Sequence, residues 1–318
     1  MSSNDIHDAA PSSLSHIVGQ SSVVDQLRVA IDAAFEDGRK LDDCLLVGPP
    51  GLGKSQIASI LGQELAVKCH ETLGQCIKSA ADLNALLLSA KDKEFVFIDE
   101  VHELQKVFQT SLYLAIDRRK VSIIGGRSVQ SIPLAQFSLV LGTTDEHCLL
   151  SPLRDRMKLV LRLQFYTVEE LKKIVTYRAK ALEWAMEDGV PELIAKRSRG
   201  VPRLALRLVQ SCRRVCRALG EQTITLVHLE KACHLEGLDE LGLGVTERKY
   251  LNILAQGPSR LNVVASMLGL ASRTVSEVVE PPLLRLELIG KDEQGRRQLT
   301  ALGREHLLKS CPDRVNLV

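Results

Sequence analysis

The stretch GPPGLGKS at residues 48–55 decides the fold of this chain. It satisfies the phosphate-loop pattern GxxxxGK(S/T), and it stands between CLLV, an apolar run of strand type, and the helical stretch QIASILGQELAV. Glycines let backbone N–H groups approach a polyphosphate closely, and the following helix N-terminus adds partial positive charge. Lys54 is placed to reach the β- and γ-phosphates, and the Ser55 hydroxyl is placed to bind Mg²⁺. The stretch therefore predicts an α/β domain that binds a nucleoside triphosphate.

Further apolar runs extend this domain. FVFI at 95–98 and FSLVLGTT at 137–144 are typical of buried strands. Residues 21–37 have apolar positions at helical spacing behind a serine pair suited to capping. VSIIGGRSVQSIPL at 121–134 predicts a β-hairpin around its Gly-Gly pair. Because apolar strands alternate with helices, we expect a parallel sheet that is covered on both faces.

An acidic pair follows the second of these strands. Asp99 comes directly after FVFI, where it would bind Mg²⁺, and Glu100 is placed to orient or deprotonate an attacking water. The third strand ends in Thr143 and Thr144, and a hydroxyl there would sense the γ-phosphate or hold that water. Both threonines are candidates, with Thr144 slightly preferred. The acidic pair favours hydrolysis of the nucleotide over binding alone.

After Phe165 the sequence becomes helical. TVEELKKIVTYRAKAL begins with a capping box, and helical spacing continues to about Leu238 with a break at RGVPR. The Gly-rich DELGLG at 239–244 predicts a linker. Residues 245–318 predict three helices, the third ended by the prolines of VEPPLL, and then a strand, a tip and a returning strand. This order is typical of a winged helix, a module that binds DNA or protein.

The composition is that of a globular protein. The 318 residues are 45% hydrophobic and 25% charged, and no apolar run is long enough to span a membrane. The N-terminus lacks the pattern of a secretion signal, and the eight cysteines include no CxxC pair, which favours reduced thiols in the cytoplasm. Basic residues exceed acidic ones in the second half of the chain, which favours an anionic partner such as nucleic acid.

Five motifs together resemble one family. GPPGLGKS, FIDEVH, SPLRDR, RLQFYTVEEL and RSRGVPRLALRL occur in the order and near the spacing of RuvB, the AAA+ ATPase that drives branch migration of Holliday junctions. The resemblance runs from about Leu14 to His306, and FYTVEEL with RSRGVPR is its most specific part. The N-terminal sequence predicts a short disordered tail at 1–13. The resemblance implies an AAA+ nucleotide-binding domain at 14–165, a helical lid at 166–240 and a winged helix at 241–318.

The resemblance also implies a homohexameric ring with ATP bound between subunits. Arg156, the second arginine of SPLRDR, matches the arginine finger that completes the neighbour's site, a group worth roughly 10³–10⁵ in kcat. Such a role accounts for a mid-chain arginine whose partner the sequence does not show. Tyr166 matches an aromatic beside the nucleotide, and Arg203 matches the lid arginine that reports the γ-phosphate. The residues expected to bind ATP are Gly51, Gly53, Lys54, Ser55, Gln56, Tyr166 and Arg203.

Two further partners are implied, duplex DNA at four-way junctions and a RuvA-like junction-binding protein. Lys291 and Arg296 match wing positions that contact DNA, and Arg273 lies beside another such position, which Ser272 occupies. Phosphate contacts of this kind bind DNA without reading its sequence. That property suits a motor that moves over any sequence.

Some segments depart from the family pattern. Ala10 stands where the family carries an arginine, and DRR at 117–119 replaces an acidic-acidic-aromatic segment. The hairpin that follows, through which the family docks on RuvA, is shorter. TTDEH at 143–147 replaces TTRAG, which removes an arginine near the catalytic surface and adds two acids.

Three interpretations follow. The main one is an ATP-driven DNA translocase of the helicase class that drives branch migration in recombination and DNA repair. The second is a RuvB-derived paralogue that binds nucleotide as a regulated scaffold, which the altered segments motivate. The third is another AAA+ role such as clamp-loader-like remodelling, against which the order from FYTVEEL to a winged helix argues. DNA-stimulated ATP hydrolysis separates the first interpretation from the second.

Overall fold

The computed structural model describes residue 6 and residues 10–125 and 128–310. The chain forms two compact units. The first runs to Leu182 and includes Val201–Arg203, and the second comprises Glu183–Gly200 and the chain from Leu204 onward. Among the described residues, no helix has the length and apolar character needed to cross a membrane.

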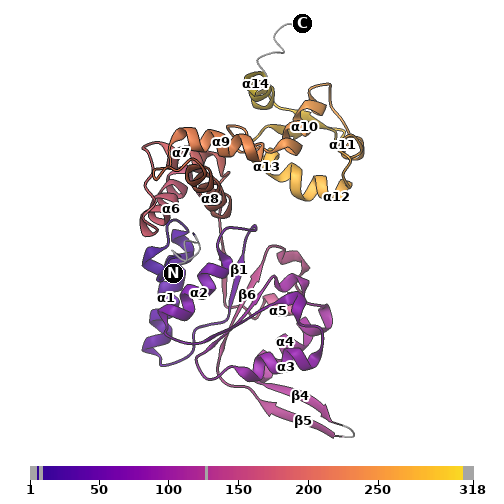
Figure 1. The fold of residues 1–318 in the computed structure, drawn as a ribbon. Coiled ribbons are helices and arrows are strands. Elements are labelled where there is room, and N and C mark those ends of the chain that lie inside the picture. The colour runs from indigo at the N-terminus through magenta and orange to yellow at the C-terminus, as the bar shows by residue number, and fades with distance from the viewer. Residues whose placement is uncertain (1–5, 7–9, 126–127, 311–318) are drawn as a thin grey trace. The chain divides into compact units, whose positions relative to one another are not determined.

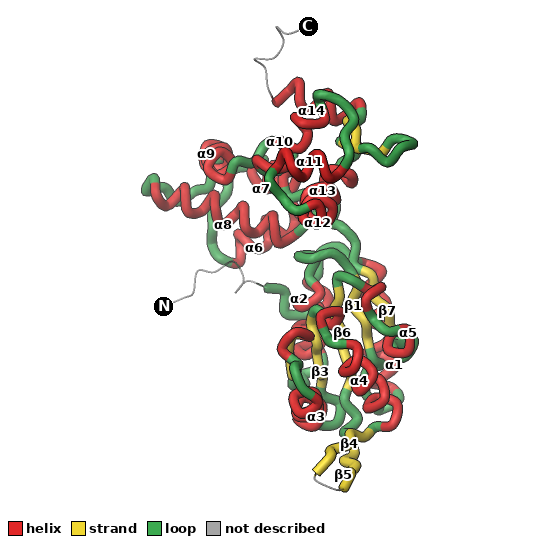
Figure 2. The backbone as a smooth tube through the Cα atoms, turned by 90° about the vertical axis from the view of Figure 1, so that its right-hand side faces the viewer, coloured by secondary structure: helices red, strands yellow, loops and turns green. Residues whose placement is uncertain are grey.

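A five-stranded parallel sheet forms the centre of the first unit, as the sequence predicted (Figures 1 and 2). The strand order is β2-β3-β6-β1-β7. The three inner strands were predicted from the sequence, and the two edge strands were not. The strands are β1 (Cys44–Val47), β2 (Cys69–Leu73), β3 (Phe95–Asp99), β6 (Ser138–Thr143) and β7 (Leu159–Arg162).

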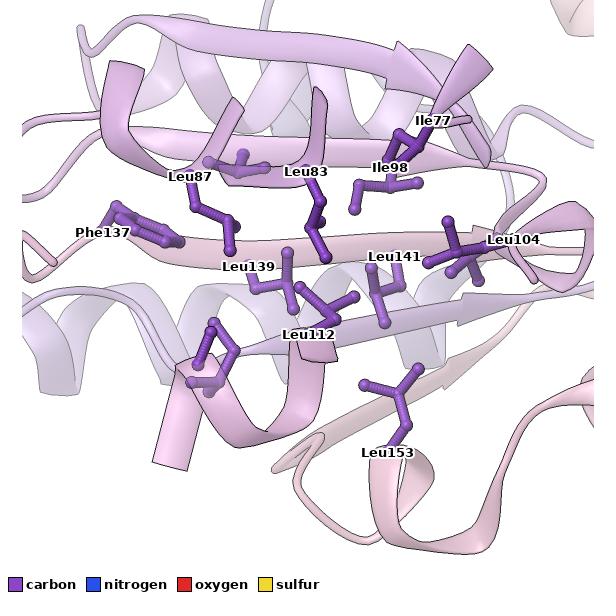
Figure 3. Close-up of a cluster of buried hydrophobic side chains, with 14 of the residues drawn as sticks. Ile77, Leu83, Leu87, Ile98, Leu104, Leu112, Phe137, Leu139, Leu141 and Leu153 are labelled. Carbon is purple, nitrogen blue, oxygen red and sulfur yellow. The ribbon is translucent and has the colours of Figure 1, made fainter. Parts of the chain in front are cut away.

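Helices cover both faces of this sheet. Alternate residues of a strand point to opposite faces, so Ile98, Leu139 and Leu141 join one core cluster (Figure 3), whereas Phe97 and Val140 join the other. The first cluster includes side chains of α3 and α4, and the second includes side chains of α1 and α2. The helices are α1 (Ser21–Glu36), α2 (Lys54–Glu64), α3 (Ala80–Ser89), α4 (Lys106–Arg118) and α5 (Ser151–Arg154).

Helix α1 begins differently from the expectation. Its N-cap is Gln20, in the left-handed conformation at φ 54°, and the serine pair Ser21-Ser22 lies inside the first turn. The Gln20 side chain instead bonds Gln164 in both directions, donating to its carbonyl oxygen at 2.7 Å and accepting from its N–H at 3.0 Å. This contact fixes the segment that leads from β7 to the next helix.

The predicted hairpin is present in the first unit. Strand β4 (Lys120–Gly125) pairs antiparallel with β5 (Ser128–Pro133), with Lys120 opposite Pro133 (Figure 2). The tip at residues 126–127 lies outside the described residues, as does most of the tail predicted at 1–13. Helix α6 (Val168–Ala181) completes this unit and begins with the predicted capping box, in which both reciprocal hydrogen bonds between Thr167 and Glu170 are formed.

The second unit begins with helical elements of the lid region. These are α7 (Val190–Arg197), α8 (Pro202–Ala218), whose first two residues belong to the other unit, and α9 (Leu226–Glu236). The segment expected as a linker is a compact turn. Asp239 Oδ1 accepts from the N–H groups of Leu241 and Leu243, and a Cβ on Gly242 would come within 1.8 Å of the Arg197 carbonyl oxygen.

The tail has the predicted order of a winged helix, with one correction (Figure 1). Pro281 and Pro282 were expected to end the third helix, but α13 (Glu280–Arg285) contains both of them. A π-helical turn at Val275–Val279 precedes them, so the helix changes its hydrogen-bond spacing where the prolines lack N–H groups. The other elements are α10 (Val245–Leu254), α11 (Leu261–Leu268), α12 (Ser272–Thr274), β8 (Ile289–Lys291), β9 (Arg297–Leu299) and α14 (Ala301–Ser310).

Candidate active site

The phosphate loop connects β1 to α2 at the carboxyl end of the parallel strands. Gly51 and Gly53 have φ values of 82° and 105°, which a residue with a side chain rarely adopts. Lys54 is only 6% exposed, and its Nζ donates to the carbonyl oxygen of Gly48 at 2.8 Å. Burial lowers the pKa of this lysine, while the charges of Glu100 and Asp99 act in the opposite direction. The loop therefore presents backbone donors and one buried cation, which suit a polyphosphate.

Two oxygen ligands suited to Mg²⁺ lie together beside this loop. Ser55 Oγ donates to Asp99 Oδ2 at 2.6 Å, so the two predicted ligand atoms are adjacent. A Cβ on Gly142 of β6 would come within 2.6 Å of Asp99 Oδ1, so a glycine is needed there to leave room for the carboxylate. Mg²⁺ is usually held by one or two protein oxygens together with phosphates and waters. The residues present fit that ion.

Glu100 has a constrained backbone and a defined set of neighbours. Its φ of 46° is in the left-handed region, which is uncommon for residues other than glycine. Its carboxylate Oε2 accepts from the Thr144 hydroxyl at 3.1 Å and lies 3.3 Å from His102 Nδ1. Thr143 is fully buried, and its hydroxyl accepts from the N–H of Asp145 at 3.0 Å. This geometry favours Thr144 over Thr143 as the hydroxyl beside the Glu100 carboxylate.

His102 is a candidate that sequence reasoning missed. It lies within the FIDEVH motif, but the motif alone did not assign it a role. In the structure its ring nitrogen Nδ1 is 3.3 Å from both Glu100 Oε2 and Thr143 Oγ1. The imidazole therefore links the ends of β3 and β6, which carry the acidic pair and the threonines.

Three further predicted nucleotide contacts, Arg203, Tyr166 and Gln56, lie at the phosphate loop. The N–H of Arg203 is 3.4 Å from the Gly51 carbonyl oxygen, and a Cβ on Gly51 would come within 3.0 Å of the Arg203 Cβ. The Tyr166 hydroxyl donates to the Leu52 carbonyl oxygen at 3.2 Å, and burial raises the pKa of this tyrosine. Gln56 lies in the first turn of α2. The structure therefore brings these residues to the phosphate loop.

Arg156 has partners within its own chain, which the sequence did not reveal. Its guanidinium forms an ion pair with Asp117, donates to the Pro152 carbonyl oxygen at 2.5 Å and lies 4.7 Å from the centre of the Tyr113 ring. The hydrogen bond from Arg156 holds the pKa of the Asp117 carboxyl below its usual range. Arg154, the first arginine of SPLRDR, donates to the Ser151 hydroxyl at 3.1 Å.

The predicted DNA contacts lie on the winged helix, and acids accompany two of them. Arg273 forms an ion pair with Glu277 at 2.8 Å, and Arg296 forms one with Asp292 at 2.7 Å. Lys291 is exposed at the end of β8. The surface that should bind phosphates is therefore less positive than its basic residues alone indicate.

A neighbouring wing arginine has a structural role. Arg297 Nε donates to Glu280 Oε1 at 2.8 Å, and the Tyr250 hydroxyl donates to the same oxygen at 2.7 Å. Glu280 is 3% exposed and Tyr250 is fully buried. A buried carboxylate needs a cation and hydrogen bonds, so this network anchors β9 of the wing to α10 and α13.

Three family models cover nearly the whole chain. The model of the Holliday junction DNA helicase RuvB P-loop domain matches residues 9–163, that of the RuvB AAA lid domain matches 166–239, and that of the RuvB C-terminal winged helix domain matches 240–308. The three matches follow one another in the chain.

The sequences of individual relatives match this chain over most of their length. The Holliday junction branch migration complex subunit RuvB of Thermotoga maritima is 37% identical over 311 residues, which are 95% of this chain and 93% of the relative. The same subunit of Fervidobacterium nodosum is 37% identical over 301 residues, 92% of this chain and 86% of the relative. A solved structure of Thermotoga maritima RuvB, described as the Holliday junction branch migration motor, matches with a TM-score of 0.80 and 36% identity over 94% of this chain and 98% of that one. The chain therefore belongs to the RuvB family of AAA+ ATPases.

Proposed function

We propose that this protein is an ATP-driven motor that moves duplex DNA through Holliday junctions during recombination and repair. The observation that carries the proposal is the grouping of Ser55, Asp99, Glu100 and Thr144 beside a phosphate loop, in a chain of the RuvB family. This grouping is suited to hydrolysis, because a carboxylate that can activate water lies next to the ligands for Mg²⁺. The proposal includes a nucleotide-binding domain at 14–165, a lid at 166–240 and a winged helix at 241–318.

Each residue has a defined task in this proposal. The loop N–H groups and Lys54 bind the phosphates of ATP, and Ser55 with Asp99 would hold Mg²⁺, which neutralises phosphate charge when bound. Glu100 orients the attacking water and accepts its proton, while the Thr144 hydroxyl fixes the position of that carboxylate through the 3.1 Å hydrogen bond. The further nucleotide contacts are Gly51, Gly53, Gln56, Tyr166 and Arg203.

The proposal also includes a homohexameric ring. Arg156 of one subunit completes the site of its neighbour, and Arg203 connects the presence of the γ-phosphate to the lid. Arg273, Lys291 and Arg296 contact DNA phosphates. A RuvA-like protein would load the ring on a junction through the β4–β5 hairpin, as the membership of the relatives in a branch migration complex suggests.

The test is branch migration of a synthetic four-way junction by the purified full chain, with ATP, Mg²⁺ and the cognate RuvA. We expect wild-type protein to separate the arms and Glu100→Gln to bind ATP and junction without turnover. Glu305→Gln is the matched control, because it removes an exposed acid on α14 whose partner is Lys309. If the wild-type protein hydrolyses ATP at a rate that no DNA changes, the motor proposal fails.

A second candidate function is a nucleotide-regulated scaffold. The altered segments motivate it, because Asp145 and Glu146 stand in the loop next to Thr144. The Glu146 carboxylate forms a bidentate ion pair with the Arg162 guanidinium, with N–O distances of 2.5 and 3.0 Å. A scaffold would bind ATP and DNA tightly, and Glu100→Gln would leave this binding and the absence of DNA-stimulated ATP hydrolysis unchanged. The same experiment therefore separates the two functions.

A further inference from the structure

The loop that follows β6 carries three metal-binding side chains within four residues. Asp145 precedes the 3₁₀ turn η4 (Glu146–Cys148), and His147 and Cys148 belong to it. One ligand atom from each of the three lies within 4.8 Å of the other two, and no second group of this kind occurs among the described residues. A 3₁₀ turn repeats every three residues, so Asp145 and Cys148 lie on the same side of it.

The two separations from the Cys148 sulfur match those around a tetrahedral zinc ion. Zn–S bonds of about 2.3 Å and Zn–N or Zn–O bonds of about 2.0–2.1 Å place sulfur roughly 3.6 Å from the other ligand atoms. Cys148 Sγ lies 3.5 Å from Asp145 Oδ2 and 3.6 Å from His147 Nε2. The imidazole also bonds Asp145 through Nδ1 at 2.5 Å, and this contact must open to admit an ion. The His147 side chain is 81% exposed, so its ring is free to turn.

The backbone that carries the ligands is held from several directions. The N–H of Asp145 donates to Thr143 Oγ1 at 3.0 Å, and the carbonyl oxygen of Cys148 accepts from Lys106 Nζ. The one other acid of the turn, Glu146, is bound by Arg162. These contacts fix the turn and leave Asp145, His147 and Cys148 to coordinate, which reduces the entropic cost of binding an ion.

From this geometry we infer that Asp145, His147 and Cys148 form a zinc site, distinct from the Mg²⁺ site at Ser55 and Asp99. A thiolate and an imidazole select a borderline-soft ion such as Zn²⁺, whereas Mg²⁺ prefers oxygen ligands only. The thiol proton of Cys148 leaves to solvent as the Zn–S bond forms, and water occupies the fourth position. Asp145 and His147 belong to the TTDEH segment, and Cys148 directly follows it.

Zinc at this position would affect the residues beside the catalytic carboxylate. Asp145 directly follows Thr144, whose hydroxyl donates to Glu100. A metal bound to Asp145 therefore restrains the backbone that positions this hydrogen bond. This consequence rests on the proposed function, but the binding of zinc does not, because it needs neither nucleotide nor DNA.

The test is a titration of the reduced, metal-free full chain with Co²⁺, followed by displacement with Zn²⁺. Tetrahedral Co²⁺ gives intense visible bands and a thiolate charge-transfer band that report its ligands. We expect one equivalent to bind to wild-type protein with both signals and Zn²⁺ to abolish them. Cys148→Ser should lose the charge-transfer band, and His147→Ala should weaken binding at least roughly 100-fold.

The matched control is Cys76→Ser, which removes the exposed thiol of a residue outside the proposed site and should leave the titration unchanged. The proposal is overturned if Cys148→Ser keeps the band, because another thiol would then be the ligand. It is equally overturned if His147→Ala binds as tightly as wild type, since Cys148 would then capture the ion without a built site. Wild-type protein that binds no equivalent of Co²⁺ or Zn²⁺ also refutes it.

Discussion

Asp117 holds the side chain of Arg156 on the surface of its own subunit, and replacing it tests how this arginine works. Besides the ion pair, Arg156 contacts Tyr113 and the carbonyl oxygen of Pro152. In the proposed ring, Arg156 must leave Asp117 to reach the γ-phosphate of a neighbour. The substitution Asp117→Asn removes the charge and keeps the size of the side chain and a hydrogen-bond acceptor.

We expect the release of Arg156 from Asp117 to change the rate of ATP hydrolysis only slightly. The side chains of Arg156 and Asp117 are 30% and 39% exposed, so solvent and salt screen their attraction. Exposed ion pairs of this kind shift an equilibrium by roughly 1.5- to 5-fold. An arginine finger contributes roughly 10³–10⁵ in kcat. We therefore expect Asp117→Asn to raise kcat by no more than about fivefold, while Arg156→Ala lowers it by roughly 10³–10⁵.

The assay is steady-state ATP hydrolysis by the full chain with saturating ATP and junction DNA. Glu305→Gln serves as the control for the loss of an exposed ion pair, since Glu305 and Lys309 are 2.8 Å apart on α14. Its kcat should equal that of the wild type. If Asp117→Asn instead lowers kcat as far as Arg156→Ala does, the reasoning is refuted, because Asp117 would then be needed in the active arrangement of the finger.

Three further predictions concern the wing and the metal ligands. Arg297→Met should lower the stability of the winged helix by about 3–5 kcal/mol, because Glu280 would remain buried without its cation. Adding Glu280→Leu should restore most of this loss, and hydrogen exchange of the winged-helix amides measures both effects. Gly142→Ala should lower kcat for ATP roughly 100-fold, because its methyl group would lie 2.6 Å from Asp99 Oδ1 and displace that ligand. An unchanged kcat would contradict this prediction, because the Asp99 carboxylate would then tolerate the added methyl group. Lys291→Ala should reduce by about 1 the slope of log K against log salt for DNA binding, and fluorescence anisotropy at several salt concentrations tests this.

The inner strands of the sheet could be predicted because each is buried on both faces. FVFI and FSLVLG are continuous apolar runs, and such runs are typical of inner parallel strands. The edge strand β2 has the sequence CHETL, in which no residue is fully buried. It pairs with β3 along only one side, so its polar residues can face solvent. Local pattern could not identify it, because its pairing depends on the neighbouring strand.

The third helix of the winged helix shows a different limit of local reasoning. Prolines usually end a helix, because they lack the N–H that bonds one turn back. The π-helical turn at Val275–Val279 changes the spacing of these bonds just before Pro281 and Pro282. Val275, Val279 and Leu283 are all buried, so packing holds the helix together through the irregular turn. The sequence shows the prolines but not the packing that accommodates them.

Some features of the candidate site could likewise be predicted from the sequence, and others could not. Motifs identified Lys54, Ser55 and the acidic pair because phosphate chemistry requires those residue types next to each other in the sequence. The partner of Arg156 could not be predicted, because Asp117 lies 39 residues away on α4 and Arg156 lies in the turn after α5. Two helices, α4 and α5, must pack before the ion pair exists. An arginine without a visible partner in the sequence was therefore not evidence that the subunit leaves it unpaired.

The acids beside the wing arginines bear on how the proposed motor holds DNA. Arg273 and Arg296 are each paired with an acid four residues away, Glu277 and Asp292 respectively. A phosphate must compete with these internal ion pairs, so each contact adds less affinity than a free arginine would. Lys291 adds a third contact to each winged helix. Weak contacts release quickly, which a stepping motor needs, and a ring supplies many of them to one duplex. We therefore expect the affinity for DNA to depend steeply on assembly of the ring, because the ring brings the contacts of several winged helices to one duplex.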